Sequence, residues 1–250
     1  MDLRLTGAGA IVTGGSRGIG KAVARALLAE GARVALLSKT PEHLATAAEE
    51  LGNGVVTVPV DTTDSAAVTA AVDEAAAKLG RLDVLVNCAA TPASSTGAKP
   101  GIENLDEDDF LAQVDTKALG YLRSIRAAVP HLRAAGGGRV VNIAGVNARM
   151  TGSITGSVRN VAVVGLTKNL ADELGKENIA VTCVHPGMTA TDSREFTEAM
   201  AARARANALG RVVDASEVAD LVAFLASPRA TAVNGAIIGV DGGQLGPIWT

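Results

Sequence analysis

The stretch Thr13-Gly14-Gly15-Ser16-Arg17-Gly18-Ile19-Gly20 decides how this 250-residue chain folds. An apolar run, Ala8–Val12, precedes it and an alanine-rich run, Lys21–Glu30, follows it, so the order is strand, glycine turn, helix. The amino end of such a helix offers free backbone N–H groups and a positive dipole end to phosphates. Gly14 permits the tight turn, and Gly18 lets the backbone approach a pyrophosphate. Gly20 lets the helix pack close to the sheet. The stretch therefore predicts a dinucleotide-binding site.

Strand-like and helical runs alternate along the rest of the chain. Buried strands are expected at Val34–Leu37, Val55–Val60, Val84–Val86, Val140–Ile143, Val181–Val184 and Ile237–Val240. Helical runs lie at Pro41–Leu51, Ser65–Leu79, Asp106–Ala135, Val158–Leu174 and Glu217–Ala226. This alternation predicts right-handed β-α-β crossovers. We expect an α/β fold: a single doubly wound, Rossmann-like domain over residues 1–250, with a mostly parallel seven-stranded sheet and helices on both faces.

Two long connections without a periodic pattern interrupt this alternation, Ala89–Leu105 and Gly187–Asp214. Both leave from the carboxyl ends of expected strands, where parallel α/β sheets bind their ligands. We therefore expect these two connections to form walls of a site for a small-molecule substrate.

The composition is that of a globular protein, with 48% hydrophobic and 20% charged residues. A net charge of −3 without a basic block gives no indication of nucleic acid as a partner. The amino-terminal residues lack a signal-peptide pattern, and no apolar run is long enough to span a membrane. A cytoplasmic protein without a membrane partner is expected.

The cysteines and histidines do not have the spacing of a disulfide framework or a metal site. Cys88 and Cys183 both belong to expected buried strands, which favours reduced core thiols and a cytoplasmic location. His43, His131 and His185 lie far apart in the sequence, so no metal is expected.

The end of the second expected strand indicates which nicotinamide cofactor binds. A fold that prefers NAD usually has an acidic residue here, which binds the ribose 2′-hydroxyl. Ser38 stands in that position, Lys39 follows it, and Arg17 of the glycine stretch is a second cation. Two cations without a carboxylate suit a 2′-phosphate, so NADP(H) is favoured over NAD(H). The alternative is that both cations are solvated surface residues.

The glycine stretch has the spacing Gly-x3-Gly-x-Gly, which resembles that of the short-chain dehydrogenase/reductase family. Further segments are similar to motifs of that family in the same order. Asn87-Cys88-Ala89-Ala90 resembles its N-N-A-G segment, His185–Thr191 contains its P-G-x-x-x-T pattern, and Asn234–Gly243 resembles its last strand and turn. The resemblance extends over nearly the whole chain.

This resemblance, together with the cations above, implies a set of cofactor-binding residues. The glycine stretch would bind the pyrophosphate, Asp61 would meet the adenine, and the P-G-x-x-x-T segment would hold the nicotinamide carboxamide. The full set is Gly14, Ser16, Arg17, Gly18, Ile19, Gly20, Ser38, Lys39, Asp61, Thr62, Asn87, Ala89, Ala90, Pro186, Gly187, Thr189 and Thr191. Asn87 is also expected to brace the central sheet.

The resemblance also implies a catalytic tyrosine and, four residues later, a lysine, together with a serine and an asparagine. Val163–Lys168 matches the stretch that follows the lysine, which puts Gly156 in the tyrosine position and Asn160 in the lysine position. The chain has one tyrosine, Tyr121, and Ile125 stands four residues after it. No Tyr-x-x-x-Lys pair therefore exists in the sequence.

The serine and asparagine positions differ as well. Asn142–Gly145 matches the family's N-I-S-S without either serine, and a count back from the helix proline puts Lys117 where the asparagine is expected. Lys117 and Asn160 look like an exchange of the family's asparagine and lysine, and they are the candidate catalytic residues. The alternative is that Lys117 faces water or pairs with a nearby carboxylate, Asp115 or Glu173.

Other polar side chains are candidates for the substrate site. Tyr121 lies one helical turn from Lys117 and could replace the missing phenol, although a role in the core or in a subunit contact is favoured. Hydroxyls and cations expected near the mouth of the pocket would bind an anionic or polar substrate: Arg149, Ser153, Thr155, Ser157 and Arg159.

The sequence therefore predicts an NADP(H)-binding oxidoreductase that acts on a carbonyl or alcohol substrate by an atypical site. A non-catalytic cofactor-binding relative, either a sensor or a partner subunit, is the alternative. The resemblance also implies a homodimer or homotetramer. Gly14–Gly18 spells the G-x-S-x-G elbow of hydrolases too, but only about a dozen residues precede it, too few for the strands and oxyanion loop that such an elbow needs.

Overall fold

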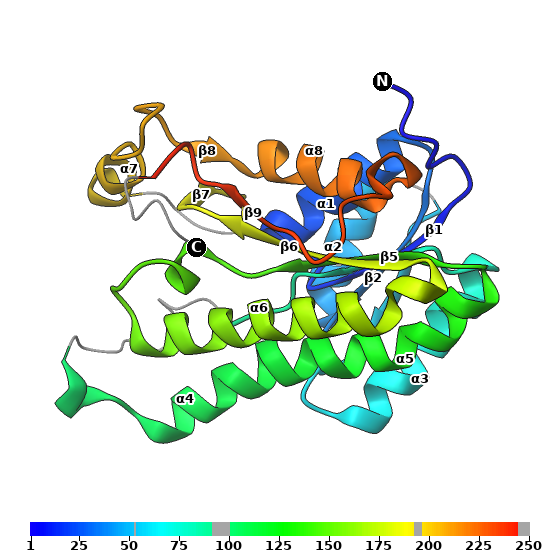
Figure 1. Ribbon diagram of the computed structural model, residues 1–250, viewed down its shortest axis with the longest axis horizontal. Coiled ribbons are helices and arrows are strands. Elements are labelled where there is room, and N and C mark those ends of the chain that lie inside the picture. The colour runs from blue at the N-terminus through cyan, green and yellow to red at the C-terminus, as the bar shows by residue number, and fades with distance from the viewer. Residues whose placement is uncertain (53, 92–100, 193–196, 245–250) are drawn as a thin grey trace.

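Seven parallel strands form one central sheet, as the sequence predicts (Figure 1). The computed structural model describes residues 1–52, 54–91, 101–192 and 197–244. All pairs of neighbouring strands in this sheet are parallel. Across the sheet the order is β3 (Val56–Pro59), β2 (Arg33–Ser38), β1 (Gly9–Thr13), β4 (Val84–Asn87), β5 (Gly138–Ile143), β6 (Ile179–Pro186) and β9 (Ile237–Val240). The doubly wound α/β fold is confirmed.

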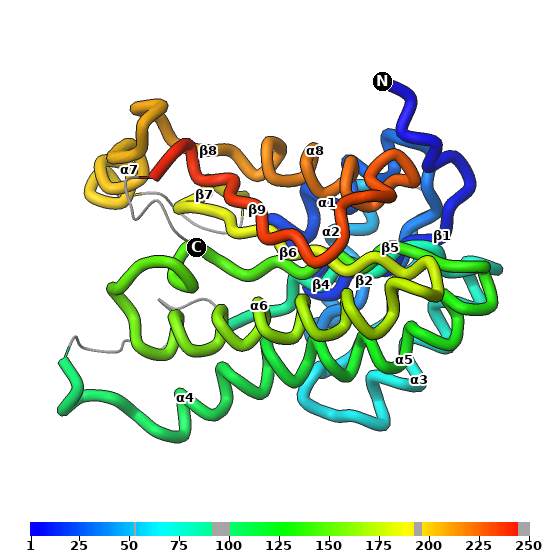
Figure 2. The backbone as a smooth tube through the Cα atoms, viewed as in Figure 1, coloured from blue at the N-terminus to red at the C-terminus, as the bar shows by residue number. Residues whose placement is uncertain are grey.

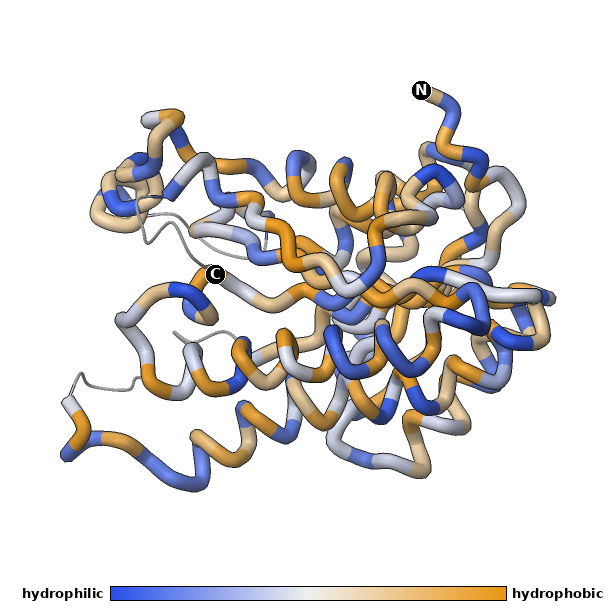
Figure 3. The backbone as a smooth tube through the Cα atoms, in the orientation of Figure 1, coloured by the Kyte–Doolittle hydropathy of each residue, from blue (hydrophilic) through white to orange (hydrophobic). Residues whose placement is uncertain are grey.

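Helices cover both faces of this sheet (Figure 1). One buried apolar cluster joins the strands to three helices: α1 (Gly18–Ala29), α2 (Pro41–Leu51) and α8 (Ala215–Ala226). A second cluster on the opposite face joins them to α3 (Ser65–Leu79), α5 (Gly120–Ala134) and α6 (Ile154–Leu174). Hydrophobic residues run along the central strands between these layers (Figure 3). None of the described helices is both long and apolar enough to cross a membrane.

The helix ends follow from local side-chain chemistry. Asp64 accepts hydrogen bonds from the first backbone N–H groups of α3, and Gly80 ends that helix in the left-handed conformation. Asp214 and Glu217 form a reciprocal capping box at the start of α8. Short 3-10 turns occur at Ile102–Asn104, Val146–Ala148, Gly175–Glu177 and Pro228–Ala230.

Two expectations about the elements need correction. The helix expected over Asp106–Ala135 is α4 (Glu107–Val114) and α5, joined by a π-helical turn at Asp115–Leu119 (Figure 2). The connection Gly187–Asp214 also has structure of its own, because two of its segments pair as a small parallel sheet. Its elements are β7 (Thr189–Ala190), α7 (Glu198–Ala204) and β8 (Val213–Asp214).

The glycine turn between β1 and α1 is sterically tight. Gly14 and Gly18 both have positive φ angles, 64° and 57°. A Cβ on Gly14 would lie 2.8 Å from the backbone nitrogen of Ala89, and one on Gly20 would lie 2.2 Å from the carbonyl oxygen of Gly14. The turn, the end of β4 and the first turn of α1 therefore touch backbone to backbone.

Gly20→Ala tests this close contact. Helix propensity alone predicts that alanine stabilises α1 by about 1 kcal/mol. The clash with the carbonyl oxygen of Gly14 should reverse the sign and lower the free energy of unfolding by about 1–3 kcal/mol, the usual cost of overpacking. Chemical denaturation of the two proteins measures the difference. A variant as stable as the parent would show that the turn is not packed as described.

Candidate functional site

The carboxyl ends of the central strands are joined by a chain of buried side-chain hydrogen bonds. The Thr13 hydroxyl donates to Asn87 Oδ1 at 3.4 Å, and Asn87 Nδ2 donates to Asn142 Oδ1 at 2.9 Å. Asn142 Nδ2 then donates to the Thr167 hydroxyl at 3.0 Å, and that hydroxyl donates to the carbonyl oxygen of Val163. This chain connects β1, β4, β5 and α6. Asn87 thus braces the sheet, and the glycine turn is fixed relative to the helix that carries Gly156 and Asn160.

Two of the residues expected at the adenosine end meet beside the glycine turn. The Ser16 hydroxyl donates to the Ser38 hydroxyl at 2.9 Å, which ties the turn to the end of β2. The exposed Lys39 pairs with Asp61 at 2.6 Å, and this hydrogen bond raises the pKa of Lys39 and lowers the pKa of Asp61. Arg17 is exposed at the amino end of α1. The cations are near the surface, and one of them already has a carboxylate partner.

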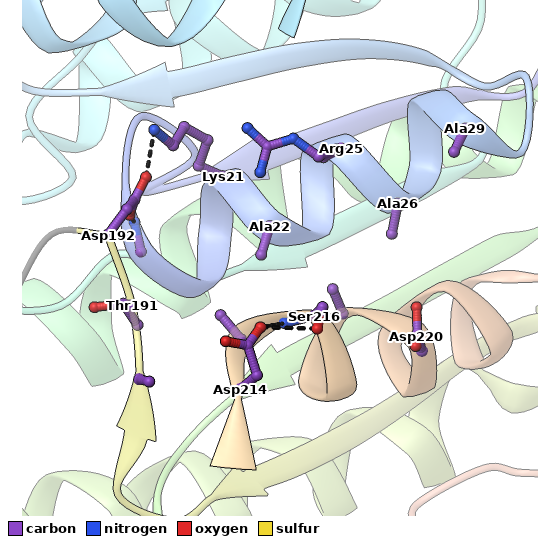
Figure 4. A pocket seen from close by; sticks show the side chains of 14 residues that line it. Lys21, Ala22, Arg25, Ala26, Ala29, Thr191, Asp192, Asp214, Ser216 and Asp220 are labelled. Atoms are coloured by element: carbon purple, nitrogen blue, oxygen red, sulfur yellow. Dashed lines mark hydrogen bonds and ion pairs between the residues drawn. The ribbon is translucent and has the colours of Figure 1, made fainter. Parts of the chain in front are cut away.

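A carboxylate from the chain occupies part of the amino end of α1. Asp192 Oδ1 accepts a hydrogen bond of 2.9 Å from the backbone N–H of Gly18, and its other oxygen pairs with Lys21 (Figure 4). Lys21 also pairs with Glu50 at 2.5 Å. These contacts border a groove of about 460 Å³ between α1 and α8. The helix end therefore accepts negative charge, as a phosphate site must.

The segments after β4 and β6 lie at the same edge of the sheet. The Ala89 N–H donates to the Thr13 hydroxyl at 3.5 Å, and Ala90 follows as an exposed residue. Gly187, directly after Pro186 at the end of β6, donates its N–H to Val240 of β9 at 3.0 Å. Thr189 begins β7 and Thr191 follows that strand. Thr62 differs, because its hydroxyl donates to the carbonyl oxygen of Thr116, at the π-helical turn.

Lys117 lies in the π-helical turn and is buried, with 4% of its surface exposed. Its Nζ donates a 2.7 Å hydrogen bond to the carbonyl oxygen of Ala144, just after β5. Asp115 pairs with Arg123 instead, so the sequence alternatives of water or a carboxylate partner for Lys117 do not occur. Burial and, to a smaller extent, the positive charge of Arg159 lower the pKa of Lys117 to about 7. π-helical turns often occur at functional sites.

Tyr121 lies one turn beyond Lys117 and is 1% exposed. Its hydroxyl donates to the carbonyl oxygen of Ile143 at 2.9 Å. Burial raises the pKa of this phenol well above its ordinary value. The phenol is therefore a core side chain and a poor acid, in agreement with the favoured sequence interpretation.

Gly156 and Asn160 face the end of β5 from helix α6. The Gly156 N–H donates to the Ser153 hydroxyl at 3.0 Å, which caps the helix. The Asn160 amide lies against Gly145, because a Cβ on that glycine would be 2.9 Å from Asn160 Nδ2. Asn160 Oδ1 is buried without a hydrogen-bond partner within the described ranges. Lys117 and Asn160 thus meet at neighbouring residues, Ala144 and Gly145.

Several side chains at the site were not identified from the sequence. His185 is buried, its Nδ1 accepts a hydrogen bond of 3.2 Å from the Gly145 N–H, and burial lowers its pKa to about 4. Gln113 is buried against Arg159, and Asp192 lies at the amino end of α1. Asp192 directly follows the P-G-x-x-x-T segment, which was the available signal, whereas Gln113 has no motif around it.

The burial of Lys117 predicts a specific pH dependence of stability. An unfolded lysine holds its proton to about pH 10.5, whereas Lys117 releases it near pH 7, so the unfolded state binds more protons between these values. The free energy of unfolding should therefore rise by a few kcal/mol across this range. Lys117→Met should abolish the rise and be more stable than the parent at pH 7 by about 2 kcal/mol. Chemical denaturation over this pH range measures the free energy of unfolding. The control is Lys168→Met, at an exposed ion pair with Asp172, which should keep the parent's rise in stability with pH. A Lys117→Met variant with the parent's pH dependence would contradict this account.

Comparison with known proteins identifies the family. A family model described as enoyl-(acyl carrier protein) reductase matches residues 14–244. A 3-alpha-(or 20-beta)-hydroxysteroid dehydrogenase of Mycobacterium tuberculosis is 36% identical over 98% of this chain and 92% of its own. A trans-4-hydroxycyclohexanecarboxylate dehydrogenase of Sinomonas cyclohexanicum is 33% identical over 94% of this chain and 92% of its own. The L-sorbose reductase of Gluconobacter frateurii, solved with NADPH and L-sorbose, has a TM-score of 0.89 at 28% identity and covers 99% of this chain and 100% of that chain. The chain belongs to the short-chain dehydrogenase/reductase family.

Proposed function

We propose that this protein is an NADP(H)-dependent oxidoreductase that interconverts a carbonyl and an alcohol, with Lys117 in place of the tyrosine as the group that exchanges the proton. The observation that carries the proposal is the buried amine of Lys117 at the end of β5, hydrogen-bonded to Ala144. The two relatives named as dehydrogenases of ring alcohols support the reaction class.

The acid-base chemistry of the site favours Lys117 over its neighbours. An amine whose pKa lies near 7 can give up and regain a proton at neutral pH. The Tyr121 phenol is tied to Ile143, and burial raises its pKa. Gly156 has no side chain, and the amide of Asn160 does not titrate. Lys117 is thus the best-placed acid and base in the described part of the site.

The chain's own residues fit a dinucleotide. The bound cofactor would accept or supply the hydride. The glycine turn packs directly against the end of β4 and the first turn of α1, where a Cβ on Gly14 or Gly20 would collide with backbone. The carboxylate of Asp192 at the N–H of Gly18 supports an anion site at this helix end, where the pyrophosphate would bind. Arg17 and Lys39 would bind the 2′-phosphate, and Lys39 would then exchange its contact with Asp61 for the phosphate.

Cofactor preference can be measured directly. The protein should bind NADPH more tightly than NADH, because the 2′-phosphate gains charge-assisted hydrogen bonds from Arg17 and Lys39. Lys39→Ala should weaken NADPH binding about tenfold and leave NADH binding nearly unchanged. Fluorescence titration of both cofactors with both proteins provides the comparison. Equal affinities in the parent, or an equal loss for both cofactors in the variant, would refute the assignment.

Turnover should depend on the protonation state of Lys117. Reduction of a ketone needs the protonated amine, so kcat/KM should fall as the pH rises above about 7, and alcohol oxidation should show the opposite trend. Lys117→Met should lower kcat/KM by about 10²–10⁴. Lys117→Arg keeps the charge but cannot release a proton, so it should be impaired equally.

The controls separate two failures of this proposal. An active Lys117→Arg variant would show that Lys117 acts by its charge alone. A parent protein that binds NADPH but turns over neither ketones nor alcohols would favour the non-catalytic alternative.

We further propose that the protein is cytoplasmic, in keeping with its free thiols.

We also propose that the protein forms a homodimer or homotetramer through the face made by α4, α5 and α6 (Figure 1). This face exposes large apolar side chains: Leu111, Leu119, Leu122, Ile154, Val158 and Val161. Light scattering should show a dimer or tetramer, and Val161→Glu should shift it toward monomer. Leu209→Glu, at an exposed apolar residue outside this face, is the matched control. A parent protein that is monomeric at micromolar concentration would contradict the proposal.

A further inference from the structure

Arg159 of α6 is a buried cation whose hydrogen-bond acceptors among the described residues are all neutral. It is 7% exposed, and its Nη1 donates to the carbonyl oxygen of Thr91 and to Gln113 Oε1, both at 2.8 Å. Its Nε is buried without a partner, and its Nη2 forms none of the hydrogen bonds found among the described residues. The described residues therefore hold the guanidinium by one end, and none of them pairs with its Nε–Nη2 edge.

Lys117 is the second cation of this region, and it too has a neutral acceptor, the carbonyl oxygen of Ala144. Neither cation forms an ion pair with a carboxylate of the described residues. Asp109 accepts a hydrogen bond from the Gln113 amide, and Gln113 in turn accepts one from Arg159. The positive charge of Arg159 lowers the pKa of Lys117, so the two groups repel each other. Burying an ion without a partner costs several kcal/mol, and two like ions cost more.

Apart from Asp109, which acts on Arg159, and Asp241, which acts on His185, the titratable groups near these cations supply no negative charge. Burial raises the pKa values of the Cys88 and Cys183 thiols to about 12, so both are neutral at pH 7. His185 is neutral too, and because its Nδ1 accepts from Gly145, its proton lies on Nε2, which has no partner within the described ranges. The site thus has an excess of hydrogen-bond donors and of positive charge.

We propose that the substrate of this oxidoreductase carries a carboxylate, which binds to the Nε–Nη2 edge of Arg159 while Lys117 faces the reacting oxygen. The inference rests on the proposed function and names the substrate class of the same site. A guanidinium edge presents two parallel N–H groups that match the two oxygens of a carboxylate. The bound anion also offsets the repulsion between Arg159 and Lys117. Arg159 is therefore the residue that determines specificity.

Binding, rather than turnover, tests the proposal. Matched pairs of a keto acid and its carboxamide, such as 4-oxocyclohexanecarboxylate and 4-oxocyclohexanecarboxamide, are titrated calorimetrically into the protein with NADP⁺ bound. The carboxylate of at least one pair should bind about tenfold or more tightly than its carboxamide. Arg159→Gln should reduce this preference to less than about twofold, and Arg159→Lys should restore part of it. Arg126→Gln, at an exposed arginine of α5 that contacts Ser65, should keep the parent's preference.

A second readout does not depend on folding of a variant. The bound carboxylate should raise the pKa of Lys117. When the carboxylate binds to the parent protein at about one pH unit above that pKa, the complex should therefore take up protons. Calorimetry in buffers of different ionisation enthalpy measures this uptake. If no pair shows a carboxylate preference although NADP⁺ binds, the inference is wrong while the proposed function stands. If NADP⁺ does not bind, the proposed function itself fails.

Discussion

The buried hydrogen-bond chain from Thr13 through Asn87 and Asn142 to Thr167 is the constraint on which the site depends. Each strand in a parallel sheet ends at the same edge, but strand pairing alone does not fix how a turn and a helix on that edge lie relative to each other. The chain of side-chain amides and hydroxyls does so, because in a dry interior a polar group without its partner is costly. The glycine turn and helix α6 thereby form one rigid unit.

The end of this unit at Ala144 is unusual in its charge. Relatives of this chain are named as dehydrogenases and reductases, and the site around Ala144 has an amine where a neutral side chain is expected from the family resemblance. The π-helical turn at Asp115–Leu119 includes Lys117, which is buried beneath the end of β5. Burial lowers the pKa of Lys117 toward neutrality. An amine with such a pKa can gain and lose a proton at neutral pH, which a lysine on the surface does not do.

The sequence predicts the sheet and most helices because their signals are local. Runs such as Val181–Val184 are short and rich in β-branched residues, as buried strands are, and the glycine spacing indicates the first turn. The π-helical turn could not be predicted, since a helical run does not show where one extra residue widens it. The burial of Lys117 and the contact of Asp192 with Gly18 depend on residues distant in the chain. No local pattern therefore contains them.

The ionisation of Lys117 can itself be measured. Lysine side chains labelled with ¹³C at Cε can be followed by NMR across the neutral and alkaline range, and Lys117→Arg assigns the signal. We expect this one lysine to titrate near pH 7, far below the ordinary value of 10.5. A Lys117 signal that titrates near 10.5 would contradict it, because an amine with that pKa would keep its proton at neutral pH.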